Sequence, residues 1–229
     1  MKYLQIQTKE ECNLKCRFCP NSYLKQSGNL MKESTFDKIL KDLKGYKGSF
    51  ALHLMNEPTL DKRIPKFIKK IRDKFKTNRI YISTNGTRTD EKYLRHLMDL
   101  GVTELSISCY TKDILDKYKH MSSDNIHIHN FINPPESFYN RGGNIEVSQR
   151  ECSGYCERPF ETMYIKWDGK AVLCCSDYKG EVVMGDVNKD SMTDIFNNKK
   201  YKVYREHLKQ GKRDLPLCNK CNYESNKLQ

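Results

Sequence analysis

The sequence of 229 residues lacks the features that would direct it out of the cytosol. No apolar run approaches the roughly 20 residues that a membrane-spanning helix needs. The first residues, MKYLQIQT, resemble a strand and lack the charged, apolar and small-residue segments of a secretion signal. No internal repeat or low-complexity segment is apparent. We therefore expect a soluble, cytoplasmic protein with one sizeable domain and an appendage.

Acidic residues are in the minority, with 29 Asp and Glu against 41 Lys and Arg, which gives a net charge of +12. The basic residues are scattered over expected helices, as in KILKDLKGYKG and KFIKKIRDKFK, and do not form an arm or a stripe. Such scattering is typical of a solvated exterior, so neither a nucleic-acid nor a membrane partner is expected.

Cysteine is abundant, with ten residues. A reducing compartment disfavours disulfides, so a cysteine-rich chain without a secretion signal is expected to use thiolates as metal ligands. The positions of these cysteines therefore carry most of the functional information.

Short apolar strands alternate with amphipathic helices over the first part of the chain. The expected strands are residues 2–8, 49–55, 79–86, 103–109 and 125–131. The expected helices are residues 34–43 with a Ser34 cap, residues 64–75, a helix between Asp90 and Gly101, and residues 112–121. Strand–helix repeats predict parallel strands, right-handed crossovers and a site at the carboxyl ends of the strands.

Each expected strand has one apolar face and one polar face. Gln5 and Gln7 alternate with apolar residues in the first strand, and Ser106 and Ser108 do so in the fourth. A parallel sheet with helices on both faces would be apolar on both. The pattern therefore predicts an α/β fold in which the sheet curls around a wet cavity. Five to six units are too few to close a barrel, so a partial (β/α) barrel is expected.

The pattern changes after Asn133. NPPESFYNRGGN has loop composition, NIEVSQ (144–149) is a further candidate strand, and TMYIKWDGKAVLCC predicts a hairpin that turns at Asp168-Gly169. A helix is expected to start at the Ser191–Asp194 capping box. We predict two domains, a partial barrel at 1–144 and a small hairpin-plus-helix domain at 145–229.

Cys12, Cys16 and Cys19 follow the first strand with C-x3-C-x2-C spacing. A [4Fe–4S] cluster held by three thiolates would leave one iron open to a substrate or cofactor. The alternatives are a zinc site with a distant fourth ligand, or a redox thiol set. The position of the triad directly after the first strand of a βα array disfavours both.

The segment CNLKCRFC, with Phe18 before the third cysteine, resembles the signature of the radical S-adenosylmethionine (SAM) superfamily. In that superfamily the open iron is chelated by the amino and carboxylate groups of SAM. Reductive cleavage of SAM then yields methionine and a 5′-deoxyadenosyl radical that abstracts a substrate hydrogen. The resemblance implies this chemistry here.

Further positions match the SAM-binding segments of that superfamily. Glu57 in MNEP stands where the family has a G-G-E-type segment, although Met55 and Asn56 replace the glycines. STNGT resembles the ribose-contacting segment. The family's glycine-rich fifth-strand motif is absent, and HIHNF stands in its place. The implied SAM-contacting residues are Phe18, Asn56, Glu57, Ser83, Asn85, Ser108 and His127.

A second cysteine set consists of Cys156, Cys174, Cys218 and Cys221. By itself this set is compatible with a zinc knuckle, since zinc and iron–sulfur sites share such spacings. With the DGKAVLCCSD hairpin and the late C-x-x-C, it resembles the Twitch variety of the SPASM extension, which binds one auxiliary [4Fe–4S] cluster. A complete SPASM extension would need cysteines beyond Cys221. The implied cluster is fully ligated and suited to electron transfer.

Four other residues are candidates for the chemistry or for packing. Cys109 is expected to be a small buried hydrophobe. Cys152 and Cys175 are possible hydrogen-atom donors to a substrate radical, and Cys175 could also substitute as a ligand. Arg141, in the NRGGN loop, is the candidate substrate-binding residue, because its planar fork can grip hydroxyls or a phosphate.

The small size, partial barrel, single auxiliary cluster and NRGGN loop are most similar to the aminocyclitol dehydrogenases of the superfamily. That similarity implies oxidation of a secondary alcohol of a sugar or cyclitol to a ketone, with the auxiliary cluster as electron acceptor and a flavodoxin or ferredoxin-type reductant. The alternatives are an epimerase of a sugar or peptide, a peptide-modifying maturase and a structural zinc protein. A maturase usually carries a leader-binding segment, for which the first strand at about residue 3 is expected to leave no room.

Overall fold

The computed structural model describes residues 1–133, 139–146 and 153–225. The strands are β1 (Tyr3–Ile6), β2 (Ser49–Ala51), β3 (Ile80–Thr84), β4 (Glu104–Cys109), β5 (Ile126–Asn130), β6 (Thr162–Ile165), β7 (Lys170–Val172) and β8 (Val183–Asp186). The α-helices are α1 (Glu33–Asp42), α2 (Ile64–Lys74), α3 (Glu91–Asp99), α4 (Lys112–Tyr118), α5 (Arg158–Glu161), α6 (Met192–Asn197) and α7 (Lys199–Lys209). Short 3-10 turns are η1 (Pro20–Ser22), η2 (Pro58–Leu60), η3 (Lys119–Met121) and η4 (Cys218–Lys220).

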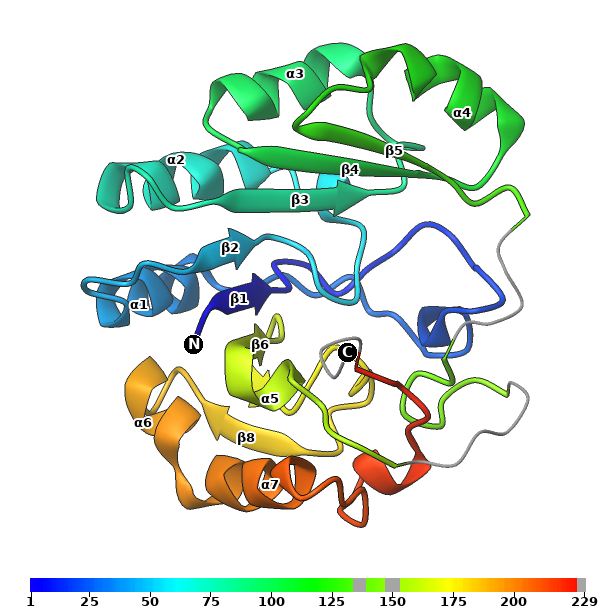
Figure 1. Cartoon of the computed structure of the whole chain (residues 1–229). Helices are drawn as coiled ribbons and strands as arrows, with labels where there is room; N and C mark the ends of the chain where they lie inside the picture. Colours follow the sequence, from blue (N-terminus) through cyan, green and yellow to red (C-terminus); the bar gives the residue numbers. More distant parts are fainter. Residues whose placement is uncertain (134–138, 147–152, 226–229) are drawn as a thin grey trace.

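All described strands form one sheet in the order β5-β4-β3-β2-β1-β6-β7-β8. Strands β1 to β6 run parallel to one another. Strand β7 pairs antiparallel with β6, and β8 pairs antiparallel with β7. The sheet stays open between β5 and β8, so the expected α/β class with an unclosed parallel array is confirmed. The carboxyl ends of the parallel strands point to one side, where the loop after β1 and the segment before the C-terminus gather (Figure 1).

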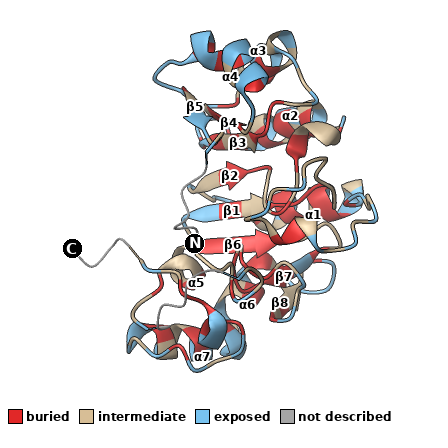
Figure 2. Ribbon diagram, turned by 90° about the vertical axis from the view of Figure 1, so that its right-hand side faces the viewer, coloured by how far each residue is buried: buried red, intermediate tan, exposed pale blue. Residues whose placement is uncertain are grey.

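The two faces of the sheet differ as the alternation predicts. On one face Phe50, Ile80, Ile82 and Leu105 are fully buried against the helices. On the other, the register places Ser83 beside Ser106, and Ser106 beside His127. Figure 2 shows burial concentrated on the strands and the inner sides of the helices, whereas α3 and α4 expose their outer sides. The polar face is therefore the one left for a site.

Helix starts were predicted with mixed success. Asp90 caps α3 by accepting a hydrogen bond from Tyr93 N at 2.7 Å, and Gly101 follows its end with φ of +109°. The Ser34 cap is wrong, because α1 begins at Glu33 after Lys32, whose side chain makes no capping bond. Lys32 already has the extended backbone of a cap, so Ser34 falls inside the first turn.

The C-terminal part of the chain joins the same sheet through β6, which is buried along its whole length beside β1. The hairpin turn is confirmed at Gly169, and Ser191 accepts from Asp194 N as a cap of α6. The described residues 144–146 of the expected extra strand are not in a strand, and 147–149 lie outside the described residues. The domain division at 144/145 stays a prediction.

No helix in the described ranges is long and apolar enough to cross a bilayer.

Candidate active site

The three-cysteine loop follows β1 and is held by its own hydrogen bonds. Cys12 N donates to Gln26 Oε1 at 2.6 Å, and Cys19 N donates to the Cys16 carbonyl at 2.9 Å. Ser22 Oγ also donates to the Cys16 carbonyl, at 2.6 Å. The loop therefore folds back on itself and brings the three thiols to one rim of the sheet.

A cavity of about 250 Å³ lies at this rim, and all three cysteines line it. Its walls come from the loop after β1, the segments following β2, β3 and β4, and two residues of the C-terminal half of the chain. The other expected site residues that line it are Phe18, Asn56, Glu57, Ser83, Asn85, Ser108 and Arg141. Residues far apart in the sequence thus converge as the strand order predicts.

Glu57 is the only carboxylate among the described residues that line the cavity, and its oxygens are already engaged. Oε1 accepts from Thr59 N and Oγ1 at 3.0 and 2.7 Å and from Thr84 Oγ1 at 2.6 Å. Oε2 accepts from Asn85 N at 2.7 Å. Burial raises the pKa of Glu57, while these donors favour its charged form. Glu57 therefore braces the loops after β2 and β3 against each other.

Asn56 and Asn85 have different surroundings. The Asn56 side-chain oxygen accepts from Leu54 N at 3.1 Å, but its Nδ2 is buried with no partner among the described residues. An unsatisfied buried donor is costly, so a bound ligand that accepts from it would be stabilised. Asn85 Nδ2 donates to Asn13 Oδ1 at 3.1 Å and approaches Cys12 Sγ at 3.9 Å. Asn85 thus orients the cysteine loop.

Eight residues that line the cavity were not predicted from the sequence, and His53, Tyr110 and Tyr178 are the titratable ones among them. His53 Nδ1 accepts from Ser83 N at 3.0 Å, and burial lowers the pKa of this imidazole to about 4. A neutral ring whose Nδ1 accepts must carry its proton on Nε2, so His53 is a donor at neutral pH. The alternation of Phe50, Leu52 and Leu54 with His53 in the strand expected at 49–55 is a signal that could have found this residue.

Tyr178 comes from the C-terminal half of the chain, and Cys19 Sγ contacts its hydroxyl at 3.9 Å. Tyr110 follows β4 and packs against Phe18 with ring centroids 5.7 Å apart. Burial raises the pKa of Tyr110 to about 12, so it keeps its proton at neutral pH. No sequence pattern distinguishes these tyrosines from core residues.

Arg141 reaches the cavity from a loop that is fixed to the end of the chain. Asn140 N donates to Asn222 Oδ1 at 2.6 Å, and Asn140 Nδ2 donates to the Lys220 carbonyl at 2.6 Å. Arg141 itself has φ of +52°, which is unusual for a residue other than glycine, and its Nε is buried without a partner among the described residues. The loop thus directs a cationic side chain into the cavity.

The four cysteines of the second set are all buried, and they come from three separate segments. Cys156 precedes α5, Cys174 follows β7, Cys218 is the first residue of η4, and Cys221 follows η4. The charge of Cys156 acts on the Cys218 thiol, and that of Cys221 acts on the thiols of Cys174 and Cys218. The fold therefore brings these four cysteines into one part of the structure, and their expected role as ligands of one cluster stays a prediction.

The other expected positions lie elsewhere. Cys109 is fully buried in the apolar core, which confirms its packing role. Cys175 is partly exposed, and Cys152 lies outside the described residues. His127 does not line the cavity; its Nε2 lies 3.6 Å from Glu104 Oε1, so its expected cofactor contact stays a prediction without structural support.

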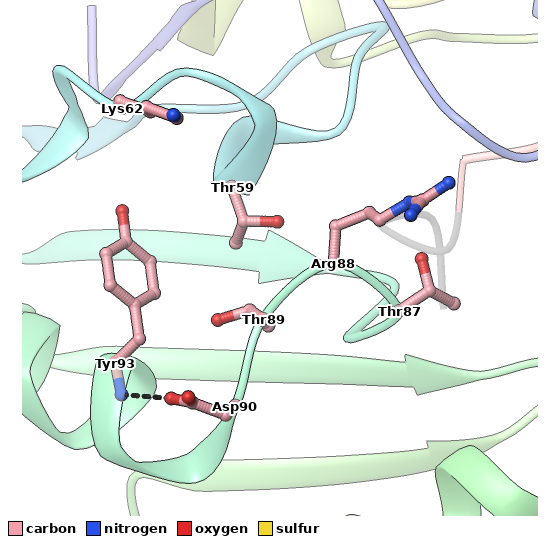
Figure 3. Close-up of a pocket in the computed structure, with 7 residues that line it drawn as sticks. All are labelled: Thr59, Lys62, Thr87, Arg88, Thr89, Asp90 and Tyr93. Atoms are coloured by element: carbon pink, nitrogen blue, oxygen red, sulfur yellow. Dashed lines mark hydrogen bonds between the residues drawn. The ribbon is translucent and has the colours of Figure 1, made fainter.

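A second hollow, of about 490 Å³, lies beside the loop from Thr87 to Asp90 and contains no cysteine. Figure 3 shows Lys62 and Arg88 at its two sides, with Thr59 and Thr89 between them. The Asp90 carboxylate that faces it already caps α3. This hollow is lined by basic and hydroxyl side chains, and its one carboxylate is already engaged.

The chemistry of Cys12, Cys16 and Cys19 suits the binding of a cationic iron–sulfur core. Burial, with added repulsion from Glu57 and the other two cysteines, raises the pKa of Cys12 to about 12. Burial and Cys19 raise the pKa of Cys16 to about 11. Iron would relieve both penalties by stabilising the thiolates. In the described ranges, no three Cys, His, Asp or Glu residues stand close enough to share one metal ion.

Comparison with known proteins agrees with this geometry. The pattern of the Radical SAM superfamily matches residues 6–129, and the SPASM iron-sulfur cluster-binding domain matches residues 156–222. The S-adenosyl-L-methionine-dependent 2-deoxy-scyllo-inosamine dehydrogenase of Niallia circulans is 24% identical over 232 residues, which cover 96% of this chain and 92% of that protein.

Solved structures show the same fold. The structure of BtrN in complex with AdoMet and 2-DOIA has a TM-score of 0.87 at 23% identity, covering 98% of this chain and 94% of that one. The structure of anSMEcpe with bound AdoMet has a TM-score of 0.55 at 14% identity, covering 90% and 80%.

The two matched domains bring SAM and two [4Fe–4S] clusters as cofactors. Cys12, Cys16 and Cys19, which line the cavity, would hold the SAM-binding cluster, and the four buried cysteines would hold the other. Since the superfamily pattern covers more than half of the chain and its three cysteines line one cavity at the carboxyl ends of the strands, this protein belongs to the radical SAM superfamily.

Proposed function

We propose that this enzyme oxidises a secondary alcohol of a sugar or cyclitol to a ketone. The observation that carries the proposal is the place of Arg141, which lines the three-cysteine cavity while its loop is hydrogen-bonded to Asn222 and Lys220, next to the second cysteine set. A substrate held by Arg141 would therefore lie between the two cysteine sites.

This placement suits the oxidation of an alcohol. The bound cofactors supply hydrogen-atom abstraction at one site and a one-electron acceptor at the other. Removal of a hydrogen atom, a proton and an electron converts a secondary alcohol into a ketone. A fully ligated cluster bound by the second cysteine set would supply an acceptor for that electron, which a redox-neutral rearrangement would not need.

The cavity side chains bind and orient the substrate and SAM. Arg141 offers a planar fork to adjacent hydroxyls, and Asn56 Nδ2 offers a free amide donor. His53 contributes an N–H donor, not a base. Glu57 accepts from four protein donors and therefore orders the walls without taking the alcohol proton.

The named function of one relative supports the same reaction. The Niallia circulans protein, a 2-deoxy-scyllo-inosamine dehydrogenase, aligns over nearly the full length of both chains. We propose a small polyhydroxylated substrate of this class for the present enzyme.

The test uses anaerobically reconstituted protein with SAM, dithionite and 2-deoxy-scyllo-inosamine, followed by related cyclitols and sugars. We expect a ketone and one 5′-deoxyadenosine per ketone. Arg141→Gln should raise KM at least tenfold, whereas Arg88→Gln, which removes a positive charge from the separate hollow, should not. Turnover with none of these alcohols, or equal effects of the two variants, would count against the proposal.

A second candidate is an epimerase, which Cys175 favours. Cys175 is partly exposed, and its charge acts on Arg141 and Tyr178, both of which line the cavity. A thiol there could return a hydrogen atom to a substrate radical. Cys175→Ser would abolish epimerisation but leave alcohol oxidation intact, so the product formed by this variant separates the two functions.

We also propose a flavodoxin or ferredoxin-type electron donor. Lys15 and Arg17 are exposed on the cysteine loop, and no acidic residue occurs from Cys12 to Lys32. Acidic reductants would approach this basic loop favourably. Lys15→Glu with Arg17→Glu should slow SAM cleavage driven by a flavodoxin, more at low than at high salt, and leave cleavage driven by dithionite unchanged.

A further inference from the structure

Aromatic rings and guanidinium groups form a continuous stack between the two cysteine sites. The Arg141 guanidinium lies over Tyr139, 4.4 Å from the ring centroid. The Arg158 guanidinium lies 4.9 Å from the centroid of the same ring and 3.5 Å from that of Tyr223. The stack thus begins at Arg141, which lines the first cavity, and continues through Tyr139 to Arg158 and Tyr223, beside the second cysteine set.

Arg158 contacts the second set in two ways. Its backbone N–H is hydrogen-bonded to the Cys156 thiol. Its Nη1 donates to Ser176 Oγ at 3.3 Å, and Ser176 N in turn donates to Cys174 Sγ at 3.4 Å. The Arg158 backbone therefore contacts Cys156 directly, and its guanidinium reaches Cys174 through Ser176.

The Arg158 guanidinium is held in place, and within the described part of the chain it has no ion-pair partner. Among the described residues, no carboxylate forms a salt bridge with it. The neighbouring Glu157 carboxylate accepts instead from the Tyr223 hydroxyl at 2.8 Å. Two aromatic rings fix the guanidinium without removing its charge.

We propose that Arg158 raises the midpoint potential of the auxiliary cluster and so makes it a better electron acceptor. A four-thiolate cluster gains one negative charge on reduction, and a fixed positive charge in a poorly solvated site stabilises the reduced form more than the oxidised form. The inference rests on the second cluster alone and does not depend on which alcohol is oxidised.

The test measures that cluster by itself. In the full-length chain, Cys12, Cys16 and Cys19 are changed to alanine, so that reconstitution loads only the second site. Potentiometric titration followed by EPR then gives its midpoint potential. We expect Arg158→Gln to shift the equilibrium at least tenfold toward the oxidised form, which is about 59 mV for a one-electron couple. Arg158→Lys should keep most of the wild-type value.

Arg205 provides a matched control. It is also stacked on two rings, with its guanidinium 4.1 Å from the Phe196 centroid and 4.7 Å from the Tyr201 centroid, but it contacts none of the four cysteines. Arg205→Gln removes the same charge from a similar setting, and the midpoint potential should not change.

Three results would overturn the proposal: an unchanged potential in Arg158→Gln, equal shifts in Arg158→Gln and Arg205→Gln, or no cluster at all in the background variant. If Arg158→Gln fails to retain iron, Tyr139→Leu replaces it. That variant removes one of the rings that fix the charge. Tyr139→Leu should lower the midpoint potential, as Arg158→Gln is expected to do, and an unchanged potential would again refute the proposal.

Discussion

Single residues of the cavity divide into those that hold the walls and those left free for ligands. Glu57 and Asn85 make several short hydrogen bonds within the protein, whereas Asn56 Nδ2 and Arg141 Nε are buried without a partner among the described residues. Buried polar atoms are normally satisfied, so the unpaired atoms mark where ligand atoms are expected. The cavity is thus rigid on one side and open to binding on the other.

His53 makes the stability of the protein depend on pH. Burial lowers its pKa in the folded protein to about 4, so between about pH 6.5 and 4 the unfolded chain binds a proton that the folded chain does not. The free energy of unfolding therefore falls as the pH falls through this window, by up to about 1.4 kcal/mol per pH unit.

His53→Asn tests this dependence, because its side-chain oxygen can still accept from Ser83 N while the titration is lost. Denaturant unfolding of identically prepared wild type and variant should give a shallower slope for the variant between pH 6.5 and 4.5. Parallel curves would show that His53 does not titrate in this range.

Among the elements, the loop of residues 139–146 has the most specific role, since it connects the two sites. Gly142 has φ of +69°, and a Cβ there would stand 2.7 Å from Leu217 Cδ1, next to Cys218. The double glycine of NRGGN is therefore needed both for the turn and for close packing on the C-terminal segment. Its sequence pattern indicated a loop and a binding arginine, but not the segment that holds it.

Gly142→Ala should destabilise the protein by about 1–3 kcal/mol and raise KM for the alcohol, because both the backbone strain and the clash with Leu217 displace Arg141. Gly45→Ala is the control, since Gly45 has a similar φ of +77° but no atom within 4 Å of the added Cβ. It should lose stability from strain alone and keep the wild-type KM. A KM increase in both variants would show that general destabilisation, and not the loop, is responsible.

The strands and helices were largely predictable because their apolar periodicity is strong and their order repeats. In α2, Phe67, Ile68 and Ile71 are buried on the side that faces the core, as the spacing indicated. The cap of α1 was not predictable, since Ser34 is by residue type the better cap, yet Lys32 takes the extended backbone at the helix start without a side-chain bond. Tyr110, Tyr178 and the Arg158 stack depend on contacts between distant segments, and local patterns cannot show such contacts.

At the scale of the whole molecule, one sheet carries both cysteine sites, because β6 pairs with β1 and extends the parallel array toward the C-terminal segment. The Arg141 loop contacts both regions, since Arg141 lines the cavity of the three cysteines and Asn140 is hydrogen-bonded to Lys220 and Asn222 beside the C-terminal pair. This arrangement separates radical generation from electron acceptance within one short chain.

Removal of the second site should separate these two activities. In the double variant Cys218→Ala and Cys221→Ala, about four of eight irons should be lost. SAM cleavage driven by dithionite should persist, whereas ketone formation should fall at least 100-fold, because the acceptor is lost and the Arg141 loop loses the segment that holds it. Iron and sulfide analysis with product quantification checks this; full ketone formation would contradict it.

The most direct test of the central claim is the mass of the product formed from a cyclitol in deuterated water by the reconstituted enzyme with SAM and dithionite. The account predicts a ketone that has lost two hydrogens and carries no solvent deuterium at the reacting carbon. A product of unchanged composition with one deuterium in place of hydrogen would instead show epimerisation and contradict the account.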